Sequence, residues 1–175
     1  MQVAPLPRTD DPAGYAREVA AALFDVDPAA VTRGAFVRFW QGELPTVVYA
    51  DAAAKGLSLS AQNGDAIGNL TTAWIPSAAV WDSEAADQTI SQFTITSVSV
   101  PDYWANAVAA GTYRDPGLHM ERVMGVLTQS YGRDPAQRYT SARSVVIDLG
   151  LLCGPTQPGG CRLVAPQQPP GPGGS

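Results

Sequence analysis

The sequence predicts an α+β fold in which N-terminal helices pack on one face of a curved antiparallel sheet. Apolar residues recur at helical spacing near the N-terminus, whereas the period changes to two from Gln88 onward. Two long β-rich runs then flank the turn-forming segment 132–135, which is typical of an antiparallel hairpin. Helices followed by antiparallel strands are the pattern of an α+β domain.

The first helix is expected to begin at Asp11-Pro12, because Asp is favoured as an N-cap and Pro at the first helical position. It should end near Asp25. The positions with apolar side chains on one face are Tyr15, Val19, Leu23 and Val26.

Asp27-Pro28 repeats the same start signal and predicts a second, short helix. Its apolar face would consist of Val31, Ala35 and Phe39. The segment 40–86 is expected to form short helices and loops over the sheet, and 46–49 is a candidate for a brief strand. Within it, Ser77 is a candidate cap for a helical turn that reaches residue 86.

A strand is predicted at 90–100, with a bulge where the apolar parity switches between Ile95 and Val98. A short helical segment should follow from Pro101 to Val108. The hairpin strands come next, and a third strand begins at 162. Alternation of side chains along the second hairpin strand predicts a core face made of Tyr139, Val145, Ile147, Leu149 and Leu151.

With 175 residues, the chain is most simply one domain. We expect an extended lead-in at 1–10, the folded domain at 11–165, and an unstructured Pro/Gly-rich tail at 166–175. The net charge of -5 argues against direct nucleic-acid binding, which usually requires a basic face. Neither a signal peptide nor a run of roughly 20 apolar residues is present, and the opening is typical of an excised domain.

Cys153 and Cys161 flank a loop that contains two Pro and three Gly, so the chain can readily bring them to disulfide distance. A disulfide would indicate an oxidising, extracytoplasmic setting. Two buried free thiols are the alternative. A zinc site is not expected, because only His119 is available as a third soft ligand and four are usual. No metal or other cofactor is predicted.

The titratable residues do not predict an active site. The sequence has no nucleophile motif of the Gly-x-Ser-x-Gly type that could act with His119, so His119 should be a surface or edge residue. Asp148 lies on the parity opposite the core face, where Arg122 or Arg143 would pair with it. The competing hypothesis is a proton-transfer site inside the fold, formed by Asp148 with Tyr131 or Tyr139.

Tyr103 and Trp104 follow the strand end at Val100-Pro101 and are candidate interaction residues, because aromatic side chains are enriched at interface centres. The alternative is that Trp104 anchors its short helix to the sheet. In that case Trp104 would be shielded from solvent.

A series of short motifs resembles the extracytoplasmic domain of conjugal-transfer proteins from actinobacterial mobile elements. The motifs, in order, are Asp11-Pro12 with the segment 20–25, Ile75-Pro76, Trp81, the segments 100–104 and 123–126, Leu152-Cys153-Gly154-Pro155, and Cys161-Arg162-Leu163. These proteins are similar to the eighth VirB component of type IV secretion systems and to its Gram-positive counterpart TcpC. The resemblance covers about residues 9–164. TcpC-type proteins carry two such domains, whereas this chain has one.

The resemblance implies a cone-shaped fold like nuclear transport factor two and a non-enzymatic scaffold function. It also implies self-association into a homo-oligomer, contacts with other secretion-channel proteins, and a membrane tether in the full-length protein. The localisation would be the cell-wall side of the membrane. The alternative is a small-molecule-binding or isomerase-like member of the same cone-shaped fold.

Overall fold

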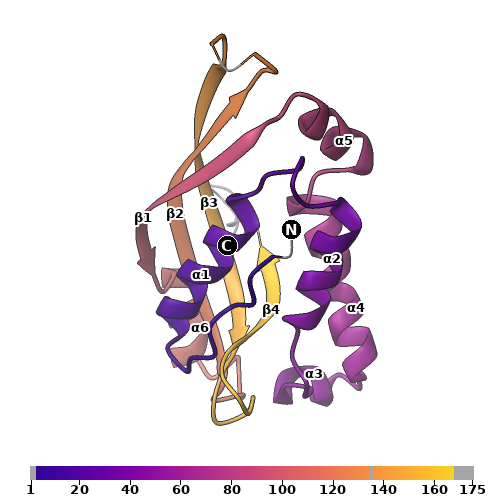
Figure 1. Ribbon diagram of the computed structural model, residues 1–175. Helices are drawn as coiled ribbons and strands as arrows, with labels where there is room; N and C mark the ends of the chain where they lie inside the picture. Colours follow the sequence, from indigo (N-terminus) through magenta and orange to yellow (C-terminus); the bar gives the residue numbers. More distant parts are fainter. Residues whose placement is uncertain (1–2, 135, 168–175) are drawn as a thin grey trace.

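In a computed structural model, the described residues are 3–134 and 136–167, and they form an α+β domain (Figure 1). The predicted fold class is therefore confirmed: helices precede and cover a four-stranded antiparallel sheet of order β1-β2-β3-β4. The strands are β1 (Ile90–Ser99), β2 (Leu118–Tyr131), β3 (Tyr139–Leu152) and β4 (Arg162–Gln167). The described part of β4 reaches two residues beyond the predicted domain end at 165, and the rest of the predicted tail lies outside the described residues.

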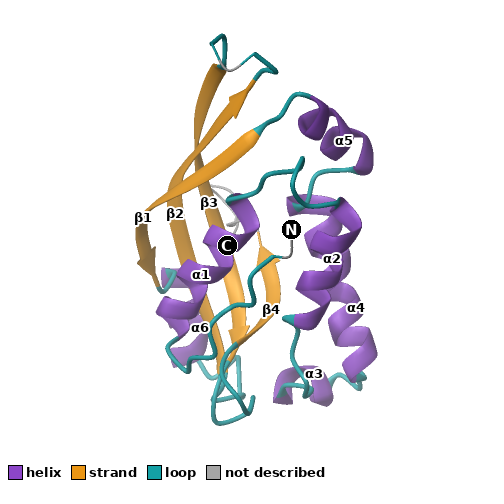
Figure 2. Ribbon diagram, in the orientation of Figure 1, coloured by secondary structure: helices purple, strands orange, loops and turns teal. Residues whose placement is uncertain are grey.

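Helix α1 (Pro12–Phe24) crosses the face of the sheet and supplies most of the cover for β1 to β3 (Figure 2). Asp11 is its N-cap residue by backbone geometry, Pro12 stands at the first position, and Asp25 is the C-cap, as predicted. The lead-in also takes part in the core, because Leu6 is buried there.

Helix α2 (Arg33–Gly42) begins later than Asp27-Pro28 predicts. The Asp27 carboxylate accepts hydrogen bonds from the backbone N–H groups of Ala29 and Ala30, which makes a turn in place of a helix start. Thr32 caps the helix instead, and its buried residues are Phe36 and Trp40. The predicted apolar face of Val31, Ala35 and Phe39 is therefore wrong, because the buried residues of α2 lie one position further along the chain, at Phe36 and Trp40.

The segment 40–86 forms short helices, as expected, but 46–49 is loop rather than strand. The helices are α3 (Ala50–Ala54), α4 (Leu59–Asn69), the π-helical turn η1 (Leu70–Trp74) and α5 (Ala78–Ala86). Helix α4 and the turn η1 pack against β4, α2 packs against α4, and α5 lies near the start of β1 (Figure 1). Ser77 accepts a hydrogen bond from the backbone N–H of Val80, which confirms it as the cap of α5.

The hairpin β2–β3 pairs along its full length, from Leu118 opposite Leu152 to Tyr131 opposite Tyr139. The register of β1 shifts between Ile95 and Ser97, where the bulge was predicted. On β3 the predicted core face is buried except for Tyr139, which is 65% exposed. Tyr139 stacks on Tyr131 at the hairpin end, where the strands extend past the helices (Figure 1).

Helix α6 (Asp102–Ala109) packs against the sheet on the side opposite α1, because its Tyr103 bonds Asp148, which has the opposite parity to the core residues of β3. It ends one residue beyond the predicted end at Val108, and Gly111 follows it with a positive φ of 70°, a conformation that favours glycine. This helix covers one end of the outer sheet face.

Candidate functional site

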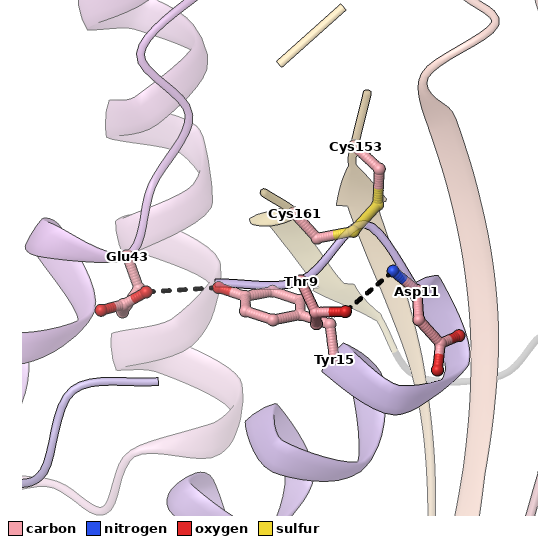
Figure 3. Close-up of a disulfide and its surroundings, with 6 residues drawn as sticks. All are labelled: Thr9, Asp11, Tyr15, Glu43, Cys153 and Cys161. Atoms are coloured by element: carbon pink, nitrogen blue, oxygen red, sulfur yellow. Dashed lines mark hydrogen bonds between the residues drawn. A yellow bond between two sulfur atoms is a disulfide. The ribbon is translucent and has the colours of Figure 1, made fainter. Parts of the chain in front are cut away.

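The Cys153–Cys161 disulfide is present and lies inside the core (Figure 3). The Cα atoms are 4.0 Å apart, and the two residues are 1% and 0% exposed. The backbone N–H of Cys161 donates a 2.7 Å hydrogen bond to the carbonyl of Thr9, so the disulfide loop also holds the N-terminal lead-in. The expectation of a disulfide is confirmed, and no free cysteine remains in the described chain.

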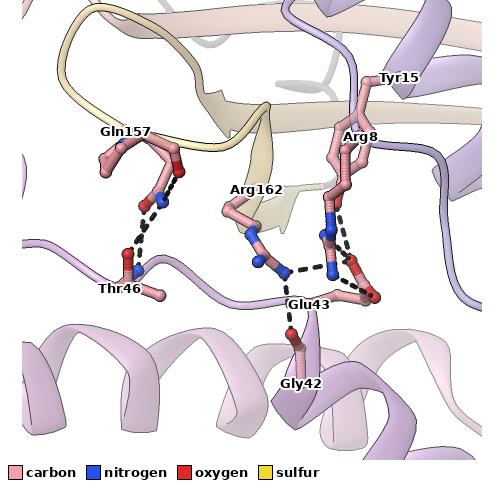
Figure 4. Close-up of polar contacts among 8 residues, drawn as sticks. Arg8, Tyr15, Gly42, Glu43, Thr46, Gln157 and Arg162 are labelled. Atoms are coloured by element: carbon pink, nitrogen blue, oxygen red, sulfur yellow. Dashed lines mark hydrogen bonds and ion pairs between the residues drawn. The ribbon is translucent and has the colours of Figure 1, made fainter.

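A buried carboxylate, Glu43, joins four parts of the chain (Figure 4) and lies near the disulfide (Figure 3). Its Oε2 accepts from Arg8 Nη1 at 2.9 Å and from the Tyr15 hydroxyl at 3.3 Å, and Arg162 Nη1 lies 3.5 Å away. Burial raises the pKa of the Tyr15 phenol, and the adjacent Glu43 charge raises it further, so Tyr15 remains a proton donor. We call Arg8, Tyr15, Glu43 and Arg162 the Glu43 cluster.

The Glu43 cluster was not predicted, and its geometry favours a structural function. Arg8 comes from the lead-in, Tyr15 from α1, Glu43 from the end of α2 and Arg162 from β4. The carboxylate is shared between two guanidinium groups and a phenol, so its charge is compensated in the interior. Nearby, Gln157 is 1% exposed and exchanges two hydrogen bonds with Thr46.

A second buried carboxylate, Asp148, lies under α6 and is fully buried. Arg122 binds it in a bidentate manner, with both N···O distances at 2.8 Å, and the Tyr103 hydroxyl donates to Oδ2 at 2.9 Å. The prediction of an Arg122 partner is confirmed and Arg143 is not the partner. The assumption that this sheet face is open to solvent is wrong here, because α6 covers it.

The hypothesis that pairs Asp148 with Tyr131 or Tyr139 is wrong, because both tyrosines lie at the far end of the hairpin. The tyrosine that contacts Asp148 is Tyr103. Burial raises the pKa of the Tyr103 phenol, and its hydrogen bond to the Asp148 carboxylate raises it further. The hydrogen bond to Asp148 also raises the pKa of the Arg122 guanidinium. Both carboxylate oxygens are therefore occupied by fixed donors.

Trp104 is 5% exposed and stacks on Tyr113 at a centroid distance of 4.2 Å. The expectation that Trp104 is an exposed contact residue is wrong; it anchors α6, which is the alternative stated above. Tyr103 is half-buried and its hydroxyl is committed to Asp148. Exposed apolar side chains around α6 include Val100 and Val108, at 51% and 49%.

His119 is half-buried near the start of β2, and burial lowers the pKa of its imidazole. Two residues on, Glu121 is 6% exposed and lacks a hydrogen-bond partner among the described residues. Burial raises the pKa of Glu121, and the nearby Asp11 charge raises it further. Within residues 3–134 and 136–167, no three His, Cys, Asp or Glu side chains are grouped so as to hold a metal ion.

A pocket of about 140 Å³ lies between the helices and the part of the sheet nearer the turn that joins β2 and β3. Its apolar wall comes from α1, α2, η1, α5 and β2, and consists chiefly of Leu23, Phe24, Phe36, Trp74, Trp81 and Leu127. Its polar lining is Glu84, Ser91, Gln129 and Arg143. No sequence motif marks this pocket, because its residues come from seven separate elements and the loops between them.

The strand register explains the arrangement of the polar residues. Ser91 pairs with Gln129 across β1 and β2, and Leu127 pairs with Arg143 across β2 and β3. Gln129 donates a 3.2 Å hydrogen bond to Ser91 Oγ. These side chains therefore extend the core face beyond the part that α1 covers.

Comparison with known proteins found no matching family model, no matching curated protein and no matching solved structure. None of the helices in the described part of the chain is both long and apolar enough to span a membrane.

Proposed function

We propose that this chain is the extracytoplasmic, non-enzymatic scaffold domain of a conjugative DNA-transfer channel, similar to TcpC and the eighth VirB component. The observation that carries the proposal is the buried Cys153–Cys161 disulfide. Disulfides persist in oxidising compartments and are rare in the cytosol, so a structural one favours the cell-wall side of the membrane. A membrane tether in the full-length protein is part of the proposal.

The architecture also supports it. The resemblance implies N-terminal helices on one face of a curved antiparallel sheet, and α1 with its neighbours covers one face of β1 to β3 in this way. The cone-shaped form like nuclear transport factor two belongs to the proposal, together with the family.

The proposed partners are other channel proteins and further copies of this chain. A net charge of -5 disfavours direct contact with the transported DNA, so the domain would act through protein contacts. Around α6, such a contact would use Val100 and Val108 rather than Trp104, because these two side chains are half-exposed and apolar.

Deletion of the gene in its native host tests the proposal. Transfer of the mobile element should fall sharply, and a plasmid copy with its native tether should restore it. A copy carrying Val100→Asp and Val108→Asp should fold but restore transfer poorly, whereas the matched control Asn106→Asp, on the same helix, should restore it fully. Unchanged transfer after deletion would contradict the scaffold function.

The second candidate is a small-molecule-binding member of the same cone-shaped fold. The pocket between the helices and the sheet favours binding, since it combines an aromatic wall with a few polar groups. Catalysis at Asp148 is not favoured, because Arg122 and Tyr103 occupy its oxygens. An isomerase-like activity would need a base with a free lone pair facing a substrate.

A further inference from the structure

The pocket between α1, α2, η1, α5 and the sheet has a wall that is unusually rich in aromatic rings. Phe24 contacts Trp74 edge-on at a centroid distance of 6.0 Å, and Phe36 lies 5.3 Å from Trp81. Leu127 is buried beneath them on β2. A cavity of about 150 Å³ with apolar walls holds one benzene molecule, so this one fits a single six-membered ring or a short branched chain.

The pocket has one charged donor without a partner. The two indole N–H groups of its wall are not open to a ligand: the Trp81 Nε1 donates a 3.1 Å hydrogen bond to the carbonyl of Val31, and the Trp74 Nε1 is fully buried. Arg143 is exposed at the pocket and makes no hydrogen bond or ion pair with any described residue.

Glu84, the acidic residue of the pocket, is less free to bind a ligand than Arg143, the basic one. Burial raises the pKa of Glu84, and a hydrogen bond with Gln129 partly opposes that increase. Gln129 in turn bonds Ser91, so the acidic side of the rim is already linked internally. Glu84 therefore has a partner in Gln129, whereas the Arg143 guanidinium has none, and a ligand that complements Arg143 must bring an acceptor.

We propose that this pocket binds a compact aromatic or branched aliphatic carboxylate. Its ring or chain packs among Phe24, Trp74, Trp81 and Leu127, and its carboxylate accepts from the Arg143 guanidinium. This inference rests on the second candidate function above and is independent of the scaffold function.

The test uses the whole chain labelled with ¹⁵N and follows the indole N–H signals of its four tryptophans. Trp74→Phe identifies the Trp74 signal. Phenylacetate is the probe, with phenylacetamide as its neutral analogue and benzylamine as its cationic analogue. Phenylacetate should shift the Trp74 signal saturably, and phenylacetamide should bind roughly 10- to 100-fold more weakly, the usual range for one charge-assisted hydrogen bond.

Arg143→Gln should weaken phenylacetate by the same roughly 10- to 100-fold, and its exposed position makes misfolding no concern. Arg17→Gln, at an exposed position of α1 away from the pocket, is the matched control and should leave binding unchanged. Equal binding of phenylacetate and phenylacetamide, an unaffected Arg143→Gln variant, or tighter binding of benzylamine would overturn the carboxylate assignment while leaving small-molecule binding intact. If none of the three probes shifts the Trp74 signal, both the ligand class and the binding function are wrong.

Discussion

Reduction of the Cys153–Cys161 disulfide should lower the free energy of unfolding by about 2.6 kcal/mol. The cysteines are separated by eight positions and close a loop of nine residues. In the chain-entropy treatment, opening such a loop returns about 8.7 cal/mol/K to the unfolded chain, which gives this figure at 25 °C. For a domain of this size, the corresponding fall in Tm is roughly 5–10 °C.

The fold should persist when the bond opens, because each free thiol still packs as a small apolar group, although the two sulfur atoms must move apart to van der Waals contact. The first contact to loosen should be the one between Cys161 N–H and the Thr9 carbonyl, which ties the lead-in to the loop. The loss is therefore expected to come mainly from the unfolded state.

Urea unfolding with and without a thiol reductant measures the difference directly. A variant with both cysteines changed to Ala is the control, because the reductant should not affect its stability. A loss of less than about 1 kcal/mol, or a reduced form more stable than the oxidised one, would refute the chain-entropy reasoning. Either result would also weaken the argument that the disulfide is structural.

Three further substitutions have expected effects on urea-induced unfolding. Asp148→Asn should destabilise the domain by about 3 kcal/mol, because it leaves the Arg122 guanidinium without its charged partner. Gly125→Ala should cost about 1–3 kcal/mol, since a Cβ there would lie 2.5 Å from the Phe93 ring. Glu121→Gln should stabilise the domain at pH 7, because the folded state raises the pKa of Glu121 through burial and so disfavours its charged form.

The sign of the Glu121 effect follows from proton binding. A carboxyl whose pKa is raised on folding binds more protons in the native state, so stability falls as the pH rises through the unfolded and folded pKa values. The advantage of Glu121→Gln should therefore vanish below the unfolded pKa of about 4.3. Glu18→Gln, at an exposed position of α1, is the control and should change stability little at either pH. If Glu121→Gln stabilised the domain equally at pH 7 and below the unfolded pKa, the burial argument would be contradicted.

For the other two substitutions, matched variants separate the cause from general damage. Tyr103→Phe removes only the neutral donor to Asp148 and should cost about 1 kcal/mol, clearly less than Asp148→Asn. Gly68→Ala adds a methyl group at a helical glycine with open space around it and should not destabilise. If Gly125→Ala were as harmless as Gly68→Ala, the close approach of Phe93 would not limit that position.

Local sequence signals predicted the elements whose structure is decided locally. Asp11-Pro12 fixes the start of α1, and the change of apolar parity in β1 reveals its bulge. The same kind of signal failed at Asp27-Pro28, because the Asp27 side chain satisfies the following N–H groups in a turn. A capping residue is equally able to start a helix or close a turn, and only the packing of Phe36 and Trp40 decides between them.

Side-chain parity predicted which side of the sheet each residue faces, but not what covers that side. Tyr139 has the core parity and is exposed, because the hairpin extends past the helices. Asp148 has the outer parity and is fully buried, because α6 lies over it. Burial depends on how far another element reaches across the sheet, and a strand's own period contains no information about that distance.

The Glu43 cluster and the pocket escaped prediction for a related reason. Glu43 meets Arg8 and Tyr15 over separations of 35 and 28 positions, so no short motif connects them. The pocket is more dispersed still, since it needs seven elements in place at once. From the sequence, Glu43 would be expected at the surface, because burying a charged side chain is unfavourable unless it is paired. The structure shows that Arg8 and Arg162 pair with it.

These contacts are distributed unevenly along the sheet, and the distribution bears on how a ligand enters. Where β3 pairs with β4, the disulfide, the Glu43 cluster and the bidentate Arg122–Asp148 pair hold the elements together. Beside the pocket, the start of α5 is tied to the α2 region by two single hydrogen bonds, from Trp81 to Val31 and from Arg33 to Pro76. At its other end, Arg133 donates to the carbonyl of Ala86, and the N–H of Gly132 donates to the carbonyl of Asp87. Among the described residues, both ends of α5 are thus held by hydrogen bonds and no ion pair, so local opening should be easier beside the pocket than at the clamped end.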